Sequence, residues 1–267
     1  MNKIFIFNDE IKSQNLDDAI KLEVLPKKED FDFNKIKIKV LKDTYLEIEY
    51  ETNIETKLEI SIKIEENASL SLFEKRVGEF TKVQYKYSLK DYSNLVVNKF
   101  YNSNGVKEMS IINLDGIYSN VEYNFKSICT QEEKYDLLVH HNARNSNSNI
   151  YNACVNTNDG EILFNISAFV PKDITGCIAD QNGRIINMNN KKCIINPNLY
   201  IEESDVVANH AAAIGKFSEE EIFYMLSRGI NYDSALNLLI KGFLLPDMNV
   251  REEKKEEIKT IIDQYWR

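Results

Sequence analysis

The residues in this chain best suited to bind a metal ion are three histidines and four cysteines. His210 follows a short apolar run, whereas His140 and His141 open an asparagine-rich stretch and are expected to be solvated at the surface. The cysteines are Cys129, Cys154, Cys177 and Cys193. They form no Cys-x-x-Cys pair and no zinc-ligand spacing, so we expect mainly inert, buried thiols in a reducing cytoplasm.

Catalytic chemistry has little support. The sequence contains no Gly-x-Ser-x-Gly elbow, no P-loop, no His-Glu-x-x-His and no glycine-rich dinucleotide loop. Glu202, Glu203 and Asp205 lie together before His210, but carboxylates at a strand end are usually solvated and general acid–base work needs burial. We expect a protein that is not an enzyme by itself.

Charge and hydropathy limit the partners. A formal net charge of −9 argues against nucleic acid or an anionic membrane, because both need a basic face. The first ten residues, MNKIFIFNDE, do not form a secretion signal, and no run of 18 apolar residues occurs. We therefore expect a soluble, cytoplasmic protein that binds another protein or a metal, with no nucleic acid and no membrane among its partners.

Strands are the elements that must position these residues. From Ile36 onward, segments such as IKIKV, YLEIEYE, LEISIKI and KVQYKYSL alternate apolar with polar residues, which predicts half-buried strands. The first 35 residues are less regular. There the run KIFIF predicts a strand, and residues 14–25 are interpreted as a short helix that Pro26 ends.

Similar corners recur at a nearly constant interval. NASL ends at Leu70, YSNL at Leu95, YSNV at Val121 and SNSNI at Ile150, with separations of 25, 26 and 29 residues. Such a repeat predicts stacked coils, each of which buries its apolar face against its neighbours. A large antiparallel sandwich with similar hairpin spacing is the alternative that periodicity leaves open.

The last 50 residues are predicted to be helical. Ser218 and Glu221 form a capping box, and Gly229 ends the first helix. Helices this short must dock on the strand domain or on a partner. Their expected apolar faces are Ile222, Met225 and Leu226, then Ala235, Leu238, Leu239 and Phe243, then Ile258, Ile261, Ile262 and Tyr265.

Three motifs near the end of the chain occur in a characteristic order. They are His210-Ala-Ala-Ala-Ile-Gly215, Phe223-Tyr224 and Ser227-Arg228-Gly229-Ile230, and further matches follow at Ala235, Leu238, Leu239, Gly242 and Phe243. Together they resemble the SufB/SufD family of iron–sulfur cluster assembly proteins. Upstream, Gln181, Asn182 and the segment PNLYI fit the same family.

This resemblance implies a fold and a set of partners. The fold is a right-handed parallel β-helix flanked by helices. Two such proteins pair through edge strands, here near residues 190–210, so the chain would pair with itself or with a SufB-like paralogue. A SufC-like ABC ATPase, which supplies the ATPase activity, would dock on the C-terminal helices. The implied contact residues are Ile222, Phe223, Tyr224, Arg228, Leu238, Leu239 and Phe243.

The resemblance also implies a ligand. His210 matches a family histidine and is expected to bind iron or a transient iron–sulfur cluster at a dimer interface, because neutral imidazole suits iron. Cys193 is the second candidate, since thiolates are the preferred cluster ligands. Ala208 stands where the family has a cysteine and can supply no thiolate. No tightly bound cofactor is expected.

We therefore predict a mainly β protein, a right-handed parallel β-helix (solenoid) with a small C-terminal helical segment. Its expected parts are an N-terminal segment over residues 1–35, a β-helix core over 36–215 and a helical segment over 216–267. The predicted role is a scaffold or accessory subunit of a SUF-type assembly complex. The alternative is a carbohydrate-binding or surface-binding solenoid, a class that usually shows exposed aromatic or acidic ladders and a secretion signal.

Overall fold

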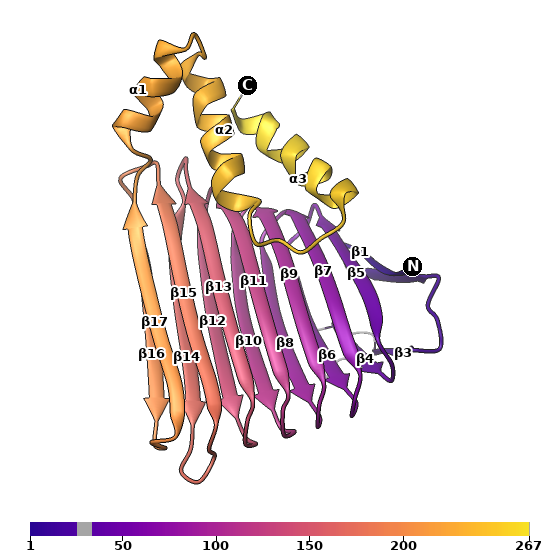
Figure 1. Cartoon of the computed structure of the whole chain (residues 1–267). Helices are drawn as coiled ribbons and strands as arrows, with labels where there is room; N and C mark the ends of the chain where they lie inside the picture. The colour runs from indigo at the N-terminus through magenta and orange to yellow at the C-terminus, as the bar shows by residue number, and fades with distance from the viewer. Residues whose placement is uncertain (26–33, 267) are drawn as a thin grey trace.

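The computed structural model describes residues 1–25 and 34–266, in which the chain winds as a solenoid between two facing sheets (Figure 1). One sheet has the strand order β17-β15-β13-β11-β9-β7-β5-β1-β2, and the other has the order β16-β14-β12-β10-β8-β6-β4-β3. Successive strands from β4 onward therefore alternate between the sheets. The first sheet contains β1 (Asn2–Phe7), β2 (Glu10–Gln14), β5 (Thr44–Thr52), β7 (Ser69–Gly78), β9 (Asn94–Ser103), β11 (Asn120–Cys129), β13 (Asn147–Asn156), β15 (Cys177–Asn187) and β17 (Val206–Gly215). The second contains β3 (Ile20–Leu25), β4 (Asn34–Val40), β6 (Thr56–Ile64), β8 (Thr81–Leu89), β10 (Val106–Leu114), β12 (Glu132–His141), β14 (Glu161–Val170) and β16 (Cys193–Ile201).

Stacking follows the sequence repeat closely. Leu70 pairs with Leu95, and Leu95 pairs with Val121, so the first three predicted corners are in register. The fourth is displaced, because Val121 pairs with Ser148 and not with Ile150. Neighbouring strands in this stack run parallel, which confirms the solenoid and excludes the antiparallel sandwich.

The corners that precede β7, β9, β11 and β13 share one turn geometry. A residue in the left-handed region is followed by a small buried residue whose backbone enters the next strand. The left-handed residues are Asn67, Tyr92, Tyr118 and Asn145, with φ between 55° and 58°. Where the small residue is serine, its hydroxyl donates to the carbonyl three residues earlier, at 2.6 to 2.8 Å. This hydrogen bond explains the recurring Ser of the repeat.

The solenoid interior is mostly aliphatic and aromatic, but it also holds charged residues. Arg76 lies 2.7 Å from Glu74, and Lys99 lies 2.7 Å from Glu108; all four side chains are buried. The Tyr101 hydroxyl lies within hydrogen-bond distance of both glutamates, 2.8 Å from Glu74 and 2.6 Å from Glu108. Each of these buried charges faces an opposite charge at 2.7 Å, which offsets part of its desolvation cost.

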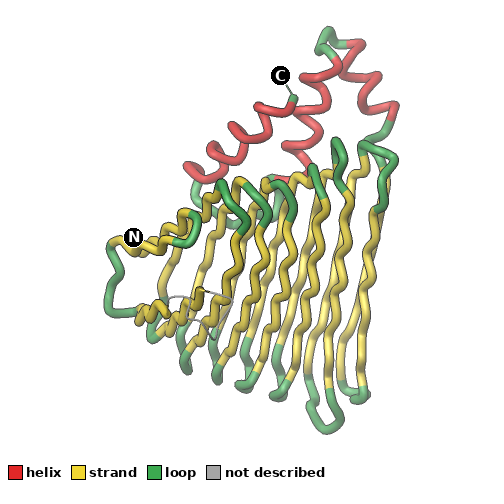
Figure 2. The backbone as a smooth tube through the Cα atoms, turned by 180° about the vertical axis from the view of Figure 1, so that it is seen from behind, coloured by secondary structure: helices red, strands yellow, loops and turns green. Residues whose placement is uncertain are grey.

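A second core lies between the outer face of the first sheet and the helices α1 (Glu219–Ser227), α2 (Tyr232–Leu244) and α3 (Glu252–Tyr265). The sheet contributes Phe73, Phe100, Ile128, Val155 and Ile186. Figure 2 shows that all three helices gather at one end of the strands. The helical segment therefore docks on the strand domain through a small apolar layer of its own. No helix in the described part of the chain is long and apolar enough to span a membrane.

The observed helix ends and buried faces agree only in part with those predicted from the sequence. Ser218 caps α1 by accepting from the amide of Glu220, not Glu221, and Gly229 ends the helix with φ 84°. The predicted apolar face of α2 is right in part: Ala235 is buried and Leu239 and Phe243 are half-buried, whereas Leu238 is exposed. The fully buried residues of the helix are Ala235, Leu236, Asn237, Ile240 and Leu244.

The helix predicted for residues 14–25 is also wrong. Residue 14 ends strand β2, and residues 20–25 form β3, antiparallel to β4. The segment IKLEVL alternates apolar and polar residues, and the edge of the second sheet offers it backbone partners. β1 pairs in parallel with β5, so strands before residue 36 extend both sheets. Pro26 lies outside the described residues.

Candidate functional site

The last coil of the solenoid places His210 at an open end. His210 lies on β17, the terminal strand of its sheet, and pairs with Gln181 of β15. Gln181 is buried in the interior, so His210 occupies an inward-facing position. Its side chain is nevertheless exposed, because no further described coil covers this end.

Cys193 begins β16, the terminal strand of the other sheet. It pairs with Ile162, a buried residue, so the thiol also occupies an inward position. Asn156 donates its side-chain amide to Sγ at 3.2 Å. Burial, with a smaller effect of the Cys154 thiol, raises the pKa of Cys193 to about 11. The thiol is therefore protonated at neutral pH unless a metal ion displaces the proton.

His210 and Cys193 do not share a ligand shell within one chain. Cys193 contacts Asn156, which pairs with Asn187 near the end of β15, whereas His210 pairs with Gln181 six residues earlier. At ~3.3 Å per residue, six residues along a strand correspond to a separation of about 20 Å. The two predicted ligands could meet one ion only across an interface.

On the outer face of the second sheet, stacked side chains from successive coils continue as far as the terminal strand β16. Asn165 donates to Asp136 at 2.6 Å, and Asn196 of β16 donates to Asn165 at 2.9 Å. A parallel ladder of rings ends at Tyr200, which stacks on Phe169 with ring centroids 4.7 Å apart. Since Tyr200 is 53% exposed, one face of its ring is available to a partner.

The helix α1 presents an apolar surface. None of its residues is buried, and Phe223 and Tyr224 are 72% and 59% exposed. The Arg228 guanidinium lies 5.2 Å from the centre of the Tyr224 ring. Leu238 on α2 is 49% exposed. These four residues of the implied ATPase contact set point outward.

The other three residues implied as ATPase contacts face the protein. Ile222 and Phe243 are half-buried and pack against the second core, and Leu239 is also half-buried. Phe243 lies between the Arg184 guanidinium, 5.3 Å from the ring centre, and the edge of the Phe217 ring. These side chains hold the helices in place, so only part of each can reach a partner.

His141 differs from its expected surface position. It is fully buried and lies 2.8 Å from the Ser146 hydroxyl through Nδ1 and 3.0 Å from the Ser148 hydroxyl through Nε2. Burial lowers its pKa to about 4. His140, by contrast, lies on the outer face and stacks on Phe169. Alternation along β12 is the reason, since neighbouring residues of a strand face opposite sides.

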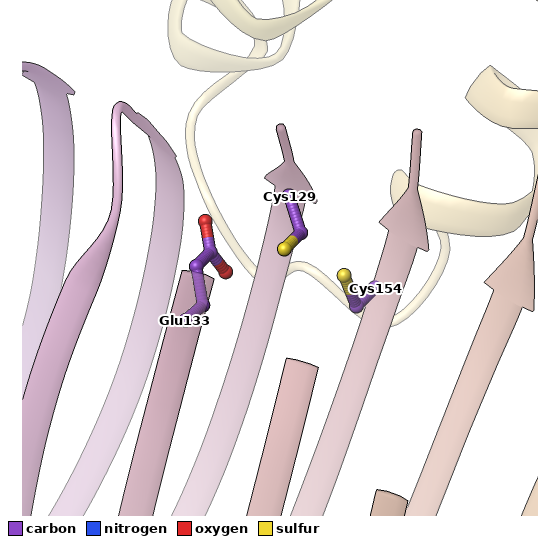
Figure 3. A group of neighbouring side chains, drawn as sticks. All are labelled: Cys129, Glu133 and Cys154. Carbon is purple, nitrogen blue, oxygen red and sulfur yellow. The ribbon is translucent and has the colours of Figure 1, made fainter. Parts of the chain in front are cut away.

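A convergent donor cluster in the interior was not predicted from the sequence. Cys129, Glu133 and Cys154 bring their donor atoms within 4.8 Å of one another (Figure 3). Cys154 follows Cys129 by 25 residues, two fewer than the 27 that separate paired residues of β11 and β13, such as Val121 and Ser148. That spacing was the available signal. The cysteine spacing does not by itself show the cluster, because the convergence of the two thiols depends on the register of β11 and β13.

The fold and the C-terminal surface together define a parallel β-solenoid protein with an open edge and a helical cap. A family model described as "SUF system FeS cluster assembly, SufBD core domain" matches residues 60–243. The chain therefore belongs to the SufB/SufD family, whose role is iron–sulfur cluster assembly.

Similar proteins occur in bacteria, archaea and plants. The chain is 28% identical over 153 residues to the iron–sulfur cluster assembly protein SufD of Bacillus subtilis, a match that covers 56% of this chain and 35% of that protein. It is 42% identical over 64 residues to a SufBD family protein of Pyrococcus horikoshii, which covers 24% of this chain and 14% of that protein. A chloroplastic protein of Arabidopsis thaliana is 25% identical over 145 residues, covering 51% and 30%. The matches thus span about a third or less of these relatives.

Proposed function

We propose that this chain is a scaffold or accessory subunit of a cytoplasmic SUF-type complex. In this proposal it pairs with itself or with a SufB-like paralogue, docks a SufC-like ABC ATPase and catalyses no reaction alone. Family membership supports the assembly role. The observation that carries the docking step is α1, a helix with large apolar side chains and no buried residue.

The docking surface consists of Phe223, Tyr224, Arg228 and Leu238. Exposed aromatic side chains beside an arginine are typical of the centre of a protein interface. Ile222 anchors α1 by packing against the second core. The helix ends at a turn in which the Gly229 amide donates to the Leu226 carbonyl at 3.0 Å. A partner could therefore cover this surface without rearranging the helix.

Pairing is proposed at β16 and β17. These are the terminal strands of their sheets, so one side of each has backbone groups free for an intermolecular sheet. At such an interface His210 of two copies, or His210 and a paralogue's residue, could hold a nascent cluster. The cluster is cargo in this proposal and not a resident cofactor.

Native anaerobic co-purification tests the proposal. We expect an ABC-type ATPase to accompany the wild-type protein and to be lost from a Phe223→Ala/Tyr224→Ala variant, since each interface aromatic contributes about 2 kcal/mol. Tyr118→Ala is the matched control, because Tyr118 is 54% exposed on a distant corner. His210→Ala should keep the ATPase and lose bound iron and sulfide.

Two outcomes would contradict it. If the ATPase stays with the double variant as firmly as with the control, docking does not use α1. If the wild-type protein emerges alone and binds a glycan, the solenoid has a different function from the rest of its family.

A further inference from the structure

The cluster of Cys129, Glu133 and Cys154 lies inside the solenoid, away from the open edge that carries His210. Cys129 ends β11, Glu133 starts β12 across the corner, and Cys154 lies near the end of β13 on the next coil. All three side chains are buried. Figure 3 shows the two sulfur atoms and the carboxylate directed toward a common space.

Glu133 has an incomplete set of partners for a buried carboxylate. The Tyr135 hydroxyl donates to Oε2 at 2.9 Å, whereas Oε1 makes no close hydrogen bond in the described part of the chain, with the Ser127 hydroxyl in its vicinity. No ion pair within that part joins Glu133 to a lysine or arginine. The interior ion pairs of Glu74 and Glu108 show what Glu133 lacks, since a buried carboxylate is normally satisfied by a cation.

We propose that Cys129, Cys154 and Glu133 bind a thiophilic divalent transition-metal ion, Zn²⁺ or Fe²⁺. Two sulfur donors and one carboxylate oxygen suit these ions, whereas Mg²⁺ and Ca²⁺ prefer oxygen ligands alone. On binding, both thiols and the Glu133 carboxyl, whose pKa burial raises to about 8, release their protons to solvent. Cys129 also gives up the hydrogen bond that it donates to the Gln131 carbonyl at 3.0 Å. The fourth position goes to Cys193 or to water.

The sheet register favours an ion over a disulfide. Cys154 pairs with Ser127 and not with Cys129, so the two cysteines are diagonal neighbours on adjacent strands. With strands ~4.8 Å apart and two residues spanning ~6.6 Å, their Cα atoms are roughly 8 Å apart, beyond the ~7 Å limit for a disulfide. A metal ion with bonds to sulfur of about 2.3 Å bridges sulfur atoms that are about 4 Å apart.

Cobalt substitution of the full chain tests the site. We expect the reduced, purified protein, unfolded and refolded with Co²⁺, to bind one ion with a thiolate-to-cobalt charge-transfer band, and Zn²⁺ to displace it. Cys129→Ser, Cys154→Ser and Glu133→Gln should each weaken binding about tenfold or more. Cys177→Ser is the matched control, because Cys177 is equally buried at the opposite corner. Cys193→Ser decides whether that thiol supplies the fourth ligand.

A second measurement covers variants that do not fold. In the wild-type protein, Zn²⁺ or anaerobic Fe²⁺ should slow alkylation of Cys129 and Cys154, mapped by peptide mass, and leave the Cys177 rate unchanged. Three results would overturn the proposal: the folded wild-type chain takes up no ion, the ion remains bound in both cysteine variants, or a Cys129–Cys154 disulfide occupies the site in native protein.

Discussion

Polar side chains inside the solenoid depend on partners that adjacent coils supply. His141 shows this clearly, because its two ring nitrogens contact the hydroxyls of Ser146 and Ser148 across the corner that joins β12 to β13. Ser146 also donates to the Ala143 carbonyl at 2.8 Å, so it accepts from the ring. The arrangement suits a neutral imidazole and disfavours an imidazolium.

Acid should therefore destabilise the protein through His141. The unfolded histidine binds a proton as the pH falls through about 6.5, whereas the folded one does so only near its lowered pKa of about 4. Between these values the unfolded state holds the extra proton, so stability is lost as the pH falls, by up to about 3 kcal/mol. The free energy of unfolding measured in urea at pH 7, 5.5 and 4.5 checks this. His141→Gln should show a shallower loss, and an equal loss in both proteins would refute the assignment.

At the scale of elements, the helical cap lies over an unpaired cation. Lys126 on β11 is fully buried on the outer face of the first sheet, and its Nζ has no hydrogen-bond partner among the described residues. The ammonium lies 3.8 Å from the centre of the Tyr151 ring. Burial lowers the pKa of Lys126 to about 8, with Asp247 opposing the shift.

Replacing this lysine should stabilise the protein. We expect Lys126→Met to raise the free energy of unfolding at pH 7 by about 1 to 3 kcal/mol, because it removes the desolvation cost of a buried charge. The advantage should shrink as the pH rises from 8 to 10.5, since only the unfolded state then stays charged. Lys107→Met on the outer surface is the control. If Lys126→Met is less stable at pH 7, the contact with Tyr151 outweighs desolvation.

At the scale of the whole molecule, the solenoid is a stack of similar coils. The terminal strands β16 and β17 have no further described coil stacked on them. At the N-terminal end the terminal strands β2 and β3 are antiparallel to their neighbours. We expect main-chain pairing between copies at the C-terminal end, because β17 carries His210 there. Small side chains along β17, among them Ala211 and Ala212, would let another backbone approach closely.

Proline scanning separates pairing from folding. Successive N–H groups of a strand point to opposite sides, so of Ala211→Pro and Ala212→Pro one removes a bond to β15 and the other removes a free edge donor. We expect one variant to lower the melting temperature and the other to leave it nearly unchanged while abolishing the proposed self-pairing. Light scattering on each protein measures the mass. A dimer that persists in the stable variant would show that pairing does not use this edge.

Much of the fold could be predicted because each coil repeats the same local sequence features, alternating strand residues and polar corner residues. Strand alternation, the corner serines and asparagines and the Gly229 helix stop are all local signals, and each agrees with the structure. The edge location of His210 followed from the family motif. The helix predicted for residues 20–25 is wrong because this segment becomes a strand only by pairing with the edge of β4. That pairing is a tertiary contact, which the short segment alone does not reveal.

Tertiary structure decided which polar residues meet. The 25-residue separation of Cys129 and Cys154 was present in the sequence, but their convergence with Glu133 required the register of β11 and β13 and the turn between β11 and β12. The sequence by itself determined the period of the coils and the face of each strand, because alternation and turn chemistry are local. Only the stacked structure determined which inward residues are covered, because burial depends on whether another coil follows.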